Sequence, residues 1–205
     1  MKKGNYYNKF DFFNITSKDL TKGYIISNFK TYQQTQNKSC GPCCVKMVLE
    51  HYNKNVDYNE SVLCSEMNTK DYPLGTALID IISWLKQKGY KYISSIEYKK
   101  DKNGLCFSSY EKFRSFVLKN LKQGYPIIVE NIEYGGHYRV IIGLDIQSKV
   151  KEEDMLIFAD PYDLNDCSDQ DGYTFCSADK FYYMWFDEHC LNENERKQPF
   201  IVIKN

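Results

Sequence analysis

Apolar side chains recur at helical spacing in three stretches of the chain before residue 125. In residues 40–53 they cover most of the helix circumference, so this helix is predicted to lie nearly buried. A second helix is predicted over residues 75–88 and ends at Gly89, a common residue just after a helix. The third is predicted over residues 109–124, with Ser109 as its N-terminal cap.

From residue 125 onward the pattern changes to short apolar runs bounded by turn residues. Four strands are predicted, at residues 125–132, 137–146, 155–159 and 200–203, with a short helix over residues 178–186. Helices followed by mainly antiparallel strands indicate an α+β fold. Its N-terminal half is expected to be helical and its C-terminal half to form an antiparallel β-sheet.

Length and composition indicate one folded domain. The 205 residues are 42% apolar, 16% aromatic and 26% charged, which suffices for a hydrophobic core and excludes a disordered chain. No internal repeat and no linker rich in Pro, Gly or Ser divides the sequence. We therefore expect a single domain over residues 1–205, with residues 1–30 as an N-terminal extension packed on it.

Charge and hydropathy exclude several classes of partner. The 27 basic and 27 acidic side chains cancel, so no strong positive field attracts nucleic acid. No apolar run approaches the roughly 18 residues of a membrane helix, and the polar start, Met1–Tyr7, lacks the apolar core of a secretory signal. We expect a cytoplasmic protein without a membrane span, or one that a host or partner carries elsewhere.

Eight cysteines are unusual in a chain expected in the cytosol. Three of them are clustered at Cys40, Cys43 and Cys44. The other five are expected to be reduced thiols that pack as small apolar residues; they are Cys64, Cys106, Cys167, Cys176 and Cys190.

Cys40 is the candidate nucleophile. It follows the polar, turn-prone segment 34–39 and begins the buried helix, where unpaired backbone N–H groups and the helix dipole favour a thiolate. A thiolate used for acyl transfer also needs a base for its proton, a group that orients the base, and donors for the oxyanion.

Only three histidines are available as the base. His51 lies on the same helix as Cys40, about 16 Å away at the helical rise per residue, and cannot reach it. His189 lies in a polar stretch typical of a surface. His137 follows two glycines and begins an apolar strand, which indicates a side chain that faces a cleft.

The orienting group is predicted to be Asp160. Asp145 lies on the same predicted strand as His137, about 26 Å away at the rise of a strand, and is excluded. Asp160 ends the next strand, and if residues 147–153 form a hairpin loop the two strands run antiparallel. Asp160 then returns to the level of His137.

These residues resemble the papain-like cysteine peptidases, and within them the branch related to the bacteriocin-leader (double-glycine) peptidases. The resemblance spans residues 30–203. Its motifs are Gln34 six residues before Cys40-Gly41, an apolar strand from His137 to Gly143, and Asp160-Pro161 at the end of the next strand.

The resemblance implies a papain-like fold whose central helix bears the nucleophile Cys40. His137 would act as general base and then acid, Asp160 would orient it, and Gln34 with the Cys40 backbone N–H would form the oxyanion hole. A stand-alone domain of this kind would cleave a peptide or isopeptide bond in a peptide or protein substrate through a thioester. It would need neither a cofactor nor a metal.

Four other hypotheses compete with this one. A binding module could keep the shape of the site without turnover. The Cys40 and Cys43 pair could be a redox dithiol, although the segment before it is polar and not the apolar strand of thioredoxin-like proteins. A zinc site at these cysteines lacks a second Cys-x-x-Cys, and the acidic segment 163–172 fits a calcium-binding loop poorly.

Overall fold

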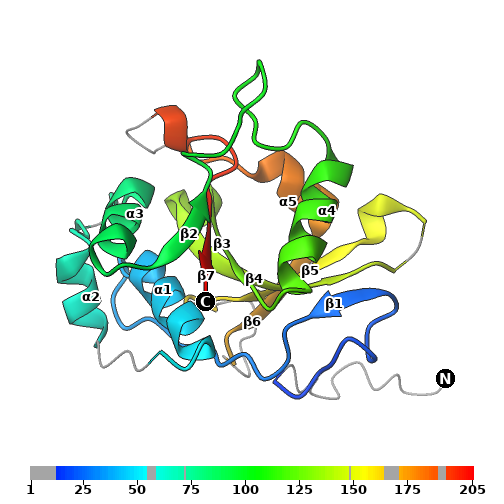
Figure 1. Cartoon of the computed structure of the whole chain (residues 1–205), viewed down its shortest axis with the longest axis horizontal. Coiled ribbons are helices and arrows are strands. Elements are labelled where there is room, and N and C mark those ends of the chain that lie inside the picture. The colour runs from blue at the N-terminus through cyan, green and yellow to red at the C-terminus, as the bar shows by residue number, and fades with distance from the viewer. Residues whose placement is uncertain (1–12, 55–58, 72, 148, 164–170, 189–192) are drawn as a thin grey trace.

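A computed structural model describes residues 13–54, 59–71, 73–147, 149–163, 171–188 and 193–205. One antiparallel β-sheet forms the centre of the molecule, and helices lie around it (Figure 1). The helices are α1 (Cys40–His51), α2 (Glu60–Glu66), α3 (Leu78–Gln87), α4 (Tyr110–Leu121) and α5 (Ala178–Met184). The strands are β1 (Gly23–Ile25), β2 (Lys91–Ser94), β3 (Ile127–Asn131), β4 (His137–Asp145), β5 (Met155–Ala159), β6 (Tyr173–Ser177) and β7 (Phe200–Lys204).

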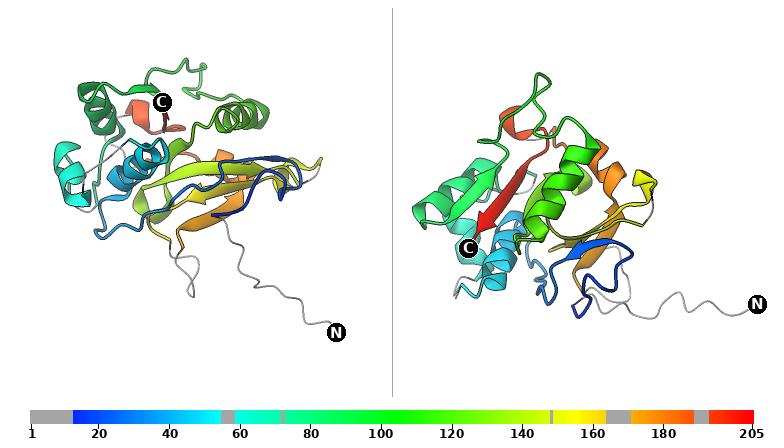
Figure 2. Two further views of the ribbon diagram at one scale, coloured as in Figure 1. Left: turned by 60° about the horizontal axis from the view of Figure 1, so that its bottom comes forward. Right: turned by 45° about the vertical axis from the view of Figure 1, so that its right-hand side comes forward.

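The sheet has the strand order β2-β7-β3-β4-β5-β6, and β1 pairs with β4 outside this path. Strand β7, which ends the chain, lies between β2 and β3 and so connects the early part of the sequence to the rest of the sheet. In Figure 1, helices α1, α2 and α3 gather beside β2 and β7, whereas α4 and α5 lie at the other side of the molecule. Figure 2 shows the sheet nearly edge-on, with helices packed against it.

The predicted α+β class is confirmed, and so are the long periodic elements. The helices predicted over residues 40–53, 75–88 and 109–124 are α1, α3 and α4, each shorter than predicted by a few residues at its ends. The Ser109 side chain accepts a hydrogen bond from the Lys112 backbone N–H, as expected of an N-terminal cap. The four predicted strands and the helix before the last one correspond to β3, β4, β5, β7 and α5.

Four elements were not predicted: α2, β1, β2 and β6. Each is short, and their residues show no long apolar period. Strand β1 lies within the predicted N-terminal extension and pairs antiparallel with the far end of β4. In β6 the buried Thr174 alternates with the exposed Phe175, which inverts the hydrophobic pattern expected of a strand.

The core is continuous from the helices to the sheet. Helix α1 is nearly buried, as its apolar circumference predicted, and it packs on β4. Strands β3, β4 and β7 are buried along almost their whole length, as expected where helices or other segments cover both faces of a strand. Among the described residues, no helix combines the length and the hydropathy that crossing a membrane requires.

Candidate active site

Cys40 is the first residue of α1, and 9% of its surface is exposed. The preceding Ser39 takes the N-cap position, but its side chain makes no cap hydrogen bond to the helix. Backbone N–H groups in the first turn of a helix lack helical partners and carry partial positive charge. Cys40 therefore lies where a thiolate is favoured.

Gly41 allows this end of α1 to approach β4 closely. A Cβ atom at position 41 would lie 3.2 Å from Ile81 Cδ1 and 3.3 Å from Tyr138 Cδ2. Contacts this short are tighter than ordinary packing, so a side chain here would press on the strand that carries His137. The glycine after the nucleophile thus serves the packing of the site.

A tight turn between β3 and β4 places His137. The pairing of β3 with β4 extends to Asn131, which lies opposite His137. The turn between the strands contains Gly136, with a φ of 113°. A Cβ atom at Gly136 would lie 2.7 Å from an oxygen of Asp187. Both the backbone conformation and the close carboxylate require glycine at this position.

The predicted antiparallel pairing of β4 and β5 brings Asp160 to His137. Val140 pairs with Ala159, and His137 Nε2 lies 2.7 Å from Asp160 Oδ1. Two further donors orient this carboxylate, the Tyr162 backbone N–H at 2.9 Å and the Thr174 hydroxyl at 3.2 Å. His137 and Asp160 are 3% and 1% exposed, so bulk water does not compete for their hydrogen bond.

The other side of the His137 ring meets the Cys40 thiol. Burial alone would raise the pKa of Cys40, but a hydrogen bond and the charge of His137, with the backbone N–H groups of Tyr138 and Gly41, lower it below its usual value. Burial likewise opposes a charge on His137, yet Asp160 and Cys40 raise its pKa to about 9. The two shifts favour a thiolate paired with an imidazolium.

Gln34 lies on the segment that leads into α1. Its Nε2 donates to the Gln36 carbonyl at 2.8 Å, which uses one of the two hydrogens of this amide nitrogen. The Gln34 backbone N–H donates to the Pro161 carbonyl at 2.8 Å. Gln34 is therefore attached to the residue that follows Asp160.

The profile of the Peptidase_C39 like family matches residues 26–188, which is most of the chain. The chain belongs to this family. It is a papain-like cysteine peptidase, as the sequence motifs predicted.

One solved structure shares the fold of the peptidase, and a second is only a weaker match. The peptidase domain of Streptococcus ComA, described as a bi-functional ABC transporter involved in a quorum sensing pathway, has a TM-score of 0.53 at 21% identity, covering 85% of this chain and 97% of that one. A double glycine motif protease from an AMS/PCAT transporter, solved in complex with its leader peptide, has a TM-score of 0.44 at 14% identity, covering 92% and 94%. Comparison with curated proteins gave no match.

Where the structure describes them, the other histidine and cysteine side chains are not the partners that His137 and Asp160 contact. In the peptidase, the His51 ring lies 5.2 Å from the Phe29 ring in a tilted arrangement, and its Nε2 is 3.3 Å from the Gly124 carbonyl, at the end of α1 away from Cys40 as predicted. His189, Cys167, Cys190 and most of the acidic segment 163–172 lie outside the described residues. The six described cysteines are free thiols, and no cluster of three or more potential metal ligands occurs among the residues the structure covers.

Cys43 is poorly suited to a dithiol with Cys40. It is 1% exposed, and burial, followed by the nearby Glu60 carboxylate, raises its pKa well above that of an ordinary thiol. A thiol that stays protonated at neutral pH is a weak nucleophile. The close partner of Cys40 in the structure is the His137 ring instead.

Glu60 is a buried residue near the site that the sequence did not reveal. It begins α2, which the hydrophobic pattern failed to predict, and it is 4% exposed. Its carboxylate accepts hydrogen bonds from the segment between Gln34 and Cys40. A local sequence signal for the start of α2 is Asn59, a residue type that often caps helices. Its side chain accepts a hydrogen bond from the Val62 backbone N–H at 2.9 Å.

Two tyrosines surround the His137 ring. The rings of Tyr134 and Tyr162 have centroids 5.6 Å and 6.2 Å from it and meet it edge-on. Tyr134 is 51% exposed and adopts a left-handed φ of 57°. The nearby Glu133 forms a 2.6 Å ion pair with Arg139, which fixes this turn to β4.

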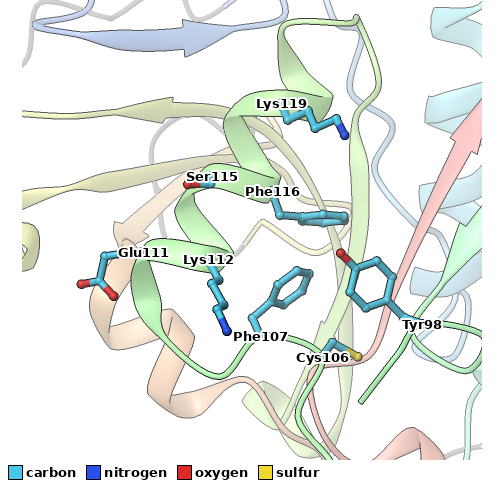
Figure 3. A pocket seen from close by; sticks show the side chains of 8 residues that line it. All are labelled: Tyr98, Cys106, Phe107, Glu111, Lys112, Ser115, Phe116 and Lys119. Carbon is cyan, nitrogen blue, oxygen red and sulfur yellow. The ribbon is translucent and has the colours of Figure 1, made fainter. Parts of the chain in front are cut away.

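The structure also contains a hollow of about 430 Å³ at α4 and the loop before it. Figure 3 shows the rings of Tyr98, Phe107 and Phe116 grouped there, with Lys112 and Lys119 on the helix. None of the lining residues is Cys40, His137, Asp160 or Gln34. The hollow is therefore separate from the candidate active site.

Proposed function

We propose that this peptidase cleaves a peptide or isopeptide bond through a thioester on Cys40. His137 takes the thiol proton, and the Cys40 thiolate attacks the carbonyl carbon of the scissile bond. Gln34 Nε2 and the Cys40 backbone N–H donate hydrogen bonds to the oxyanion. The His137 imidazolium then gives its proton to the leaving amine, and Asp160 holds the ring in place.

In the second half of the reaction the neutral His137 ring removes a proton from water, which attacks the thioester. The carboxylic acid product leaves, and the thiolate and imidazolium are restored. An acceptor amine in place of water would give acyl transfer by the same steps.

One observation carries this proposal. A single imidazole contacts both the Cys40 thiol and, at 2.7 Å, the Asp160 carboxylate, and the pKa shifts of Cys40 and His137 go in opposite directions. Groups whose environments drive their pKa values apart in this way are typical of an activated nucleophile and its base. Family membership supports the reaction type.

Alkylation by iodoacetamide, followed by mass spectrometry at neutral pH, tests the assignment of the nucleophile. We expect Cys40 to react far faster than the other described thiols, because only its pKa is lowered. Turnover is measured in parallel as new termini in a peptide library. Cys40→Ala should abolish turnover, and His137→Ala should reduce it by about 10²–10⁴-fold.

Cys43→Ser is the matched control, since it changes a neighbouring thiol on the same helix that lacks contact with His137. It should keep both rapid labelling of Cys40 and peptide turnover. Full turnover by Cys40→Ala would contradict the assignment of Cys40 as the nucleophile. Equal, slow labelling of all thiols would favour a binding module without catalysis.

A further inference from the structure

The segment that carries Gln34 is attached to a single buried carboxylate, Glu60. The Thr35 backbone N–H donates to Glu60 Oε1 at 3.0 Å, and the Gln36 backbone N–H donates to the same oxygen at 3.1 Å. The Ser39 hydroxyl lies 2.5 Å from Oε1, and the hydroxyls of Thr35 and Tyr32 lie 2.9 Å and 3.3 Å from Oε2. Glu60 thus gathers donors from both sides of Gln34.

These contacts explain why a carboxylate can be buried at this position. An unpaired buried carboxylate is costly, whereas one that accepts two backbone N–H groups and several hydroxyls is compensated. The two N–H groups can only donate, so an acceptor must face them. Without one, the Thr35 and Gln36 amides would be left unsatisfied or the segment would move.

The same segment is attached on its other side to the residues around Asp160. Gln33 Nε2 donates to the Asp160 carbonyl at 2.8 Å, and the Gln34 backbone N–H donates to the Pro161 carbonyl at 2.8 Å. Within the segment, the Gln34 side chain bonds to the Gln36 carbonyl. The position of Gln34 relative to Cys40 is therefore determined by Glu60 from one side and by Asp160-Pro161 from the other.

We propose that Glu60 is a positioning residue that holds the oxyanion-stabilising Gln34 against Cys40. This inference rests on the proposed function, because it assigns Glu60 to the oxyanion hole of that reaction. Glu60 touches neither substrate nor the reacting atoms. It acts through the hydrogen bonds that fix residues 35, 36 and 39.

Two reactions of Cys40 separate this role from general stability. Alkylation by iodoacetamide needs a thiolate but no oxyanion hole, whereas acylation by p-nitrophenyl acetate forms an oxyanion as the sulfur bonds to the acetyl carbon and p-nitrophenolate leaves. Both reagents are small, which suits a nucleophile of which 9% of the residue surface is exposed. Their rates on one variant therefore report different parts of the site.

In Glu60→Gln, an amide NH₂ replaces one acceptor oxygen, and in either orientation it faces the Thr35 backbone N–H, which lies 3.0 Å from Oε1 and 3.1 Å from Oε2. We expect the acylation rate to fall by about 10-fold or more, below the 10²–10³-fold loss from removing an oxyanion donor outright. The alkylation rate should stay within about twofold of the wild-type rate, and its pH profile should be unchanged, because the contact of His137 with Cys40 is intact.

Glu66→Gln is the matched control. Glu66 ends the same helix and accepts from Trp84 Nε1 at 2.7 Å, and it makes no hydrogen bond to residues 34–39 among the contacts of the described chain. It should leave both rates unchanged. Ser39→Ala serves if Glu60→Gln fails to fold, since it removes one Glu60 contact and should lower acylation alone, by a few-fold.

The outcomes distinguish this inference from the proposed function. Loss of acylation with preserved alkylation supports it. Equal loss of both rates, or no loss of either, overturns it, because Glu60 then affects the whole site or none of it. If wild-type protein is acylated no faster than Cys40→Ala, the proposed function itself is wrong and the inference falls with it.

Discussion

At the residue scale, the proposed reaction depends on where one proton lies between Cys40 and His137. Asp160 sits 2.7 Å from the opposite side of the imidazole and favours its protonated form. Burial alone would raise the pKa of the Cys40 thiol, and the adjacent His137, together with two backbone N–H groups, lowers it instead. The charge on each group stabilises the charge on the other, so a substitution at one of them should shift the pKa of the other.

This coupling predicts the pH dependence of turnover. The pKa of Cys40 lies below that of an ordinary thiol. The acidic limb of the pH profile should therefore also lie at a pH below the pKa of an ordinary thiol. His137 keeps its proton up to its pKa of about 9, so turnover should fall as the pH rises through that value, when the proton for the leaving amine is lost. Rates of peptide cleavage measured across this range check both limbs.

His137→Ala provides the contrast. Burial of the Cys40 thiol would then act without the opposing imidazolium, so the rise of iodoacetamide labelling with pH should move to more alkaline values. Cys43→Ser should keep the wild-type profile. An unchanged labelling profile in His137→Ala would contradict the assignment of His137 as the partner of the thiol.

At the scale of elements, β4 is the structure on which the site depends. It pairs with β1, β3 and β5, and α1 packs against it. Gly143 lies where side chains of β1 and β5 approach β4 closely, because a Cβ atom there would lie 3.0 Å from Ile25 Cγ1 and 3.1 Å from Ile157 Cδ1. Gly143 is part of the sequence motif that begins at His137, but only the packing shows why a residue without a side chain is needed there.

We predict that Gly143→Ala destabilises the protein by about 1–3 kcal/mol through overpacking. Urea unfolding followed by circular dichroism measures this change. The folded Gly143→Ala protein should keep its peptidase activity, since position 143 lies about 20 Å along the strand from His137. Leu74→Ala, at a side chain that is 57% exposed, should change stability by less than about 0.5 kcal/mol and serves as the control. A Gly143→Ala protein as stable as wild type would show that Ile25 and Ile157 can move without cost.

At the scale of the whole molecule, β7 joins the two parts of the chain. It pairs with β2, which follows the helices α1–α3, and with β3, which leads to His137. The chain has two tryptophans. Trp84 is buried in α3, and Trp185, at the end of α5, packs in the aromatic core with Phe107 and Phe113.

Because β7 is shared, we predict that the two parts unfold together. In Trp84→Phe the fluorescence of Trp185, and in Trp185→Phe that of Trp84, should follow the same urea transition as far-UV circular dichroism of the same variant. The comparison is made within each variant, since both substitutions lower stability. A fluorescence midpoint that differs clearly from the dichroism midpoint would indicate two independent folding units.

The sequence alone determined the local features of this protein. The apolar periods of α1, α3 and α4 depend on neighbours a few residues away, and they placed Cys40 at a helix start. Elimination among three histidines, together with the β4–β5 hairpin, then placed His137 near Asp160. These inferences needed only the spacing of residues along the chain.

Only the tertiary structure decided the rest. The bonds of Gln33 to Asp160 and of Thr35 to Glu60 join residues 127 and 25 positions apart, and α2, which carries Glu60, is too short for a hydrophobic period. The pKa shifts of Cys40 and His137 likewise depend on burial balanced against contacts that distant strands supply. A hydrogen bond or a buried charge is specified by what surrounds it in space, and that is fixed only when the whole sheet, closed by β7, has formed.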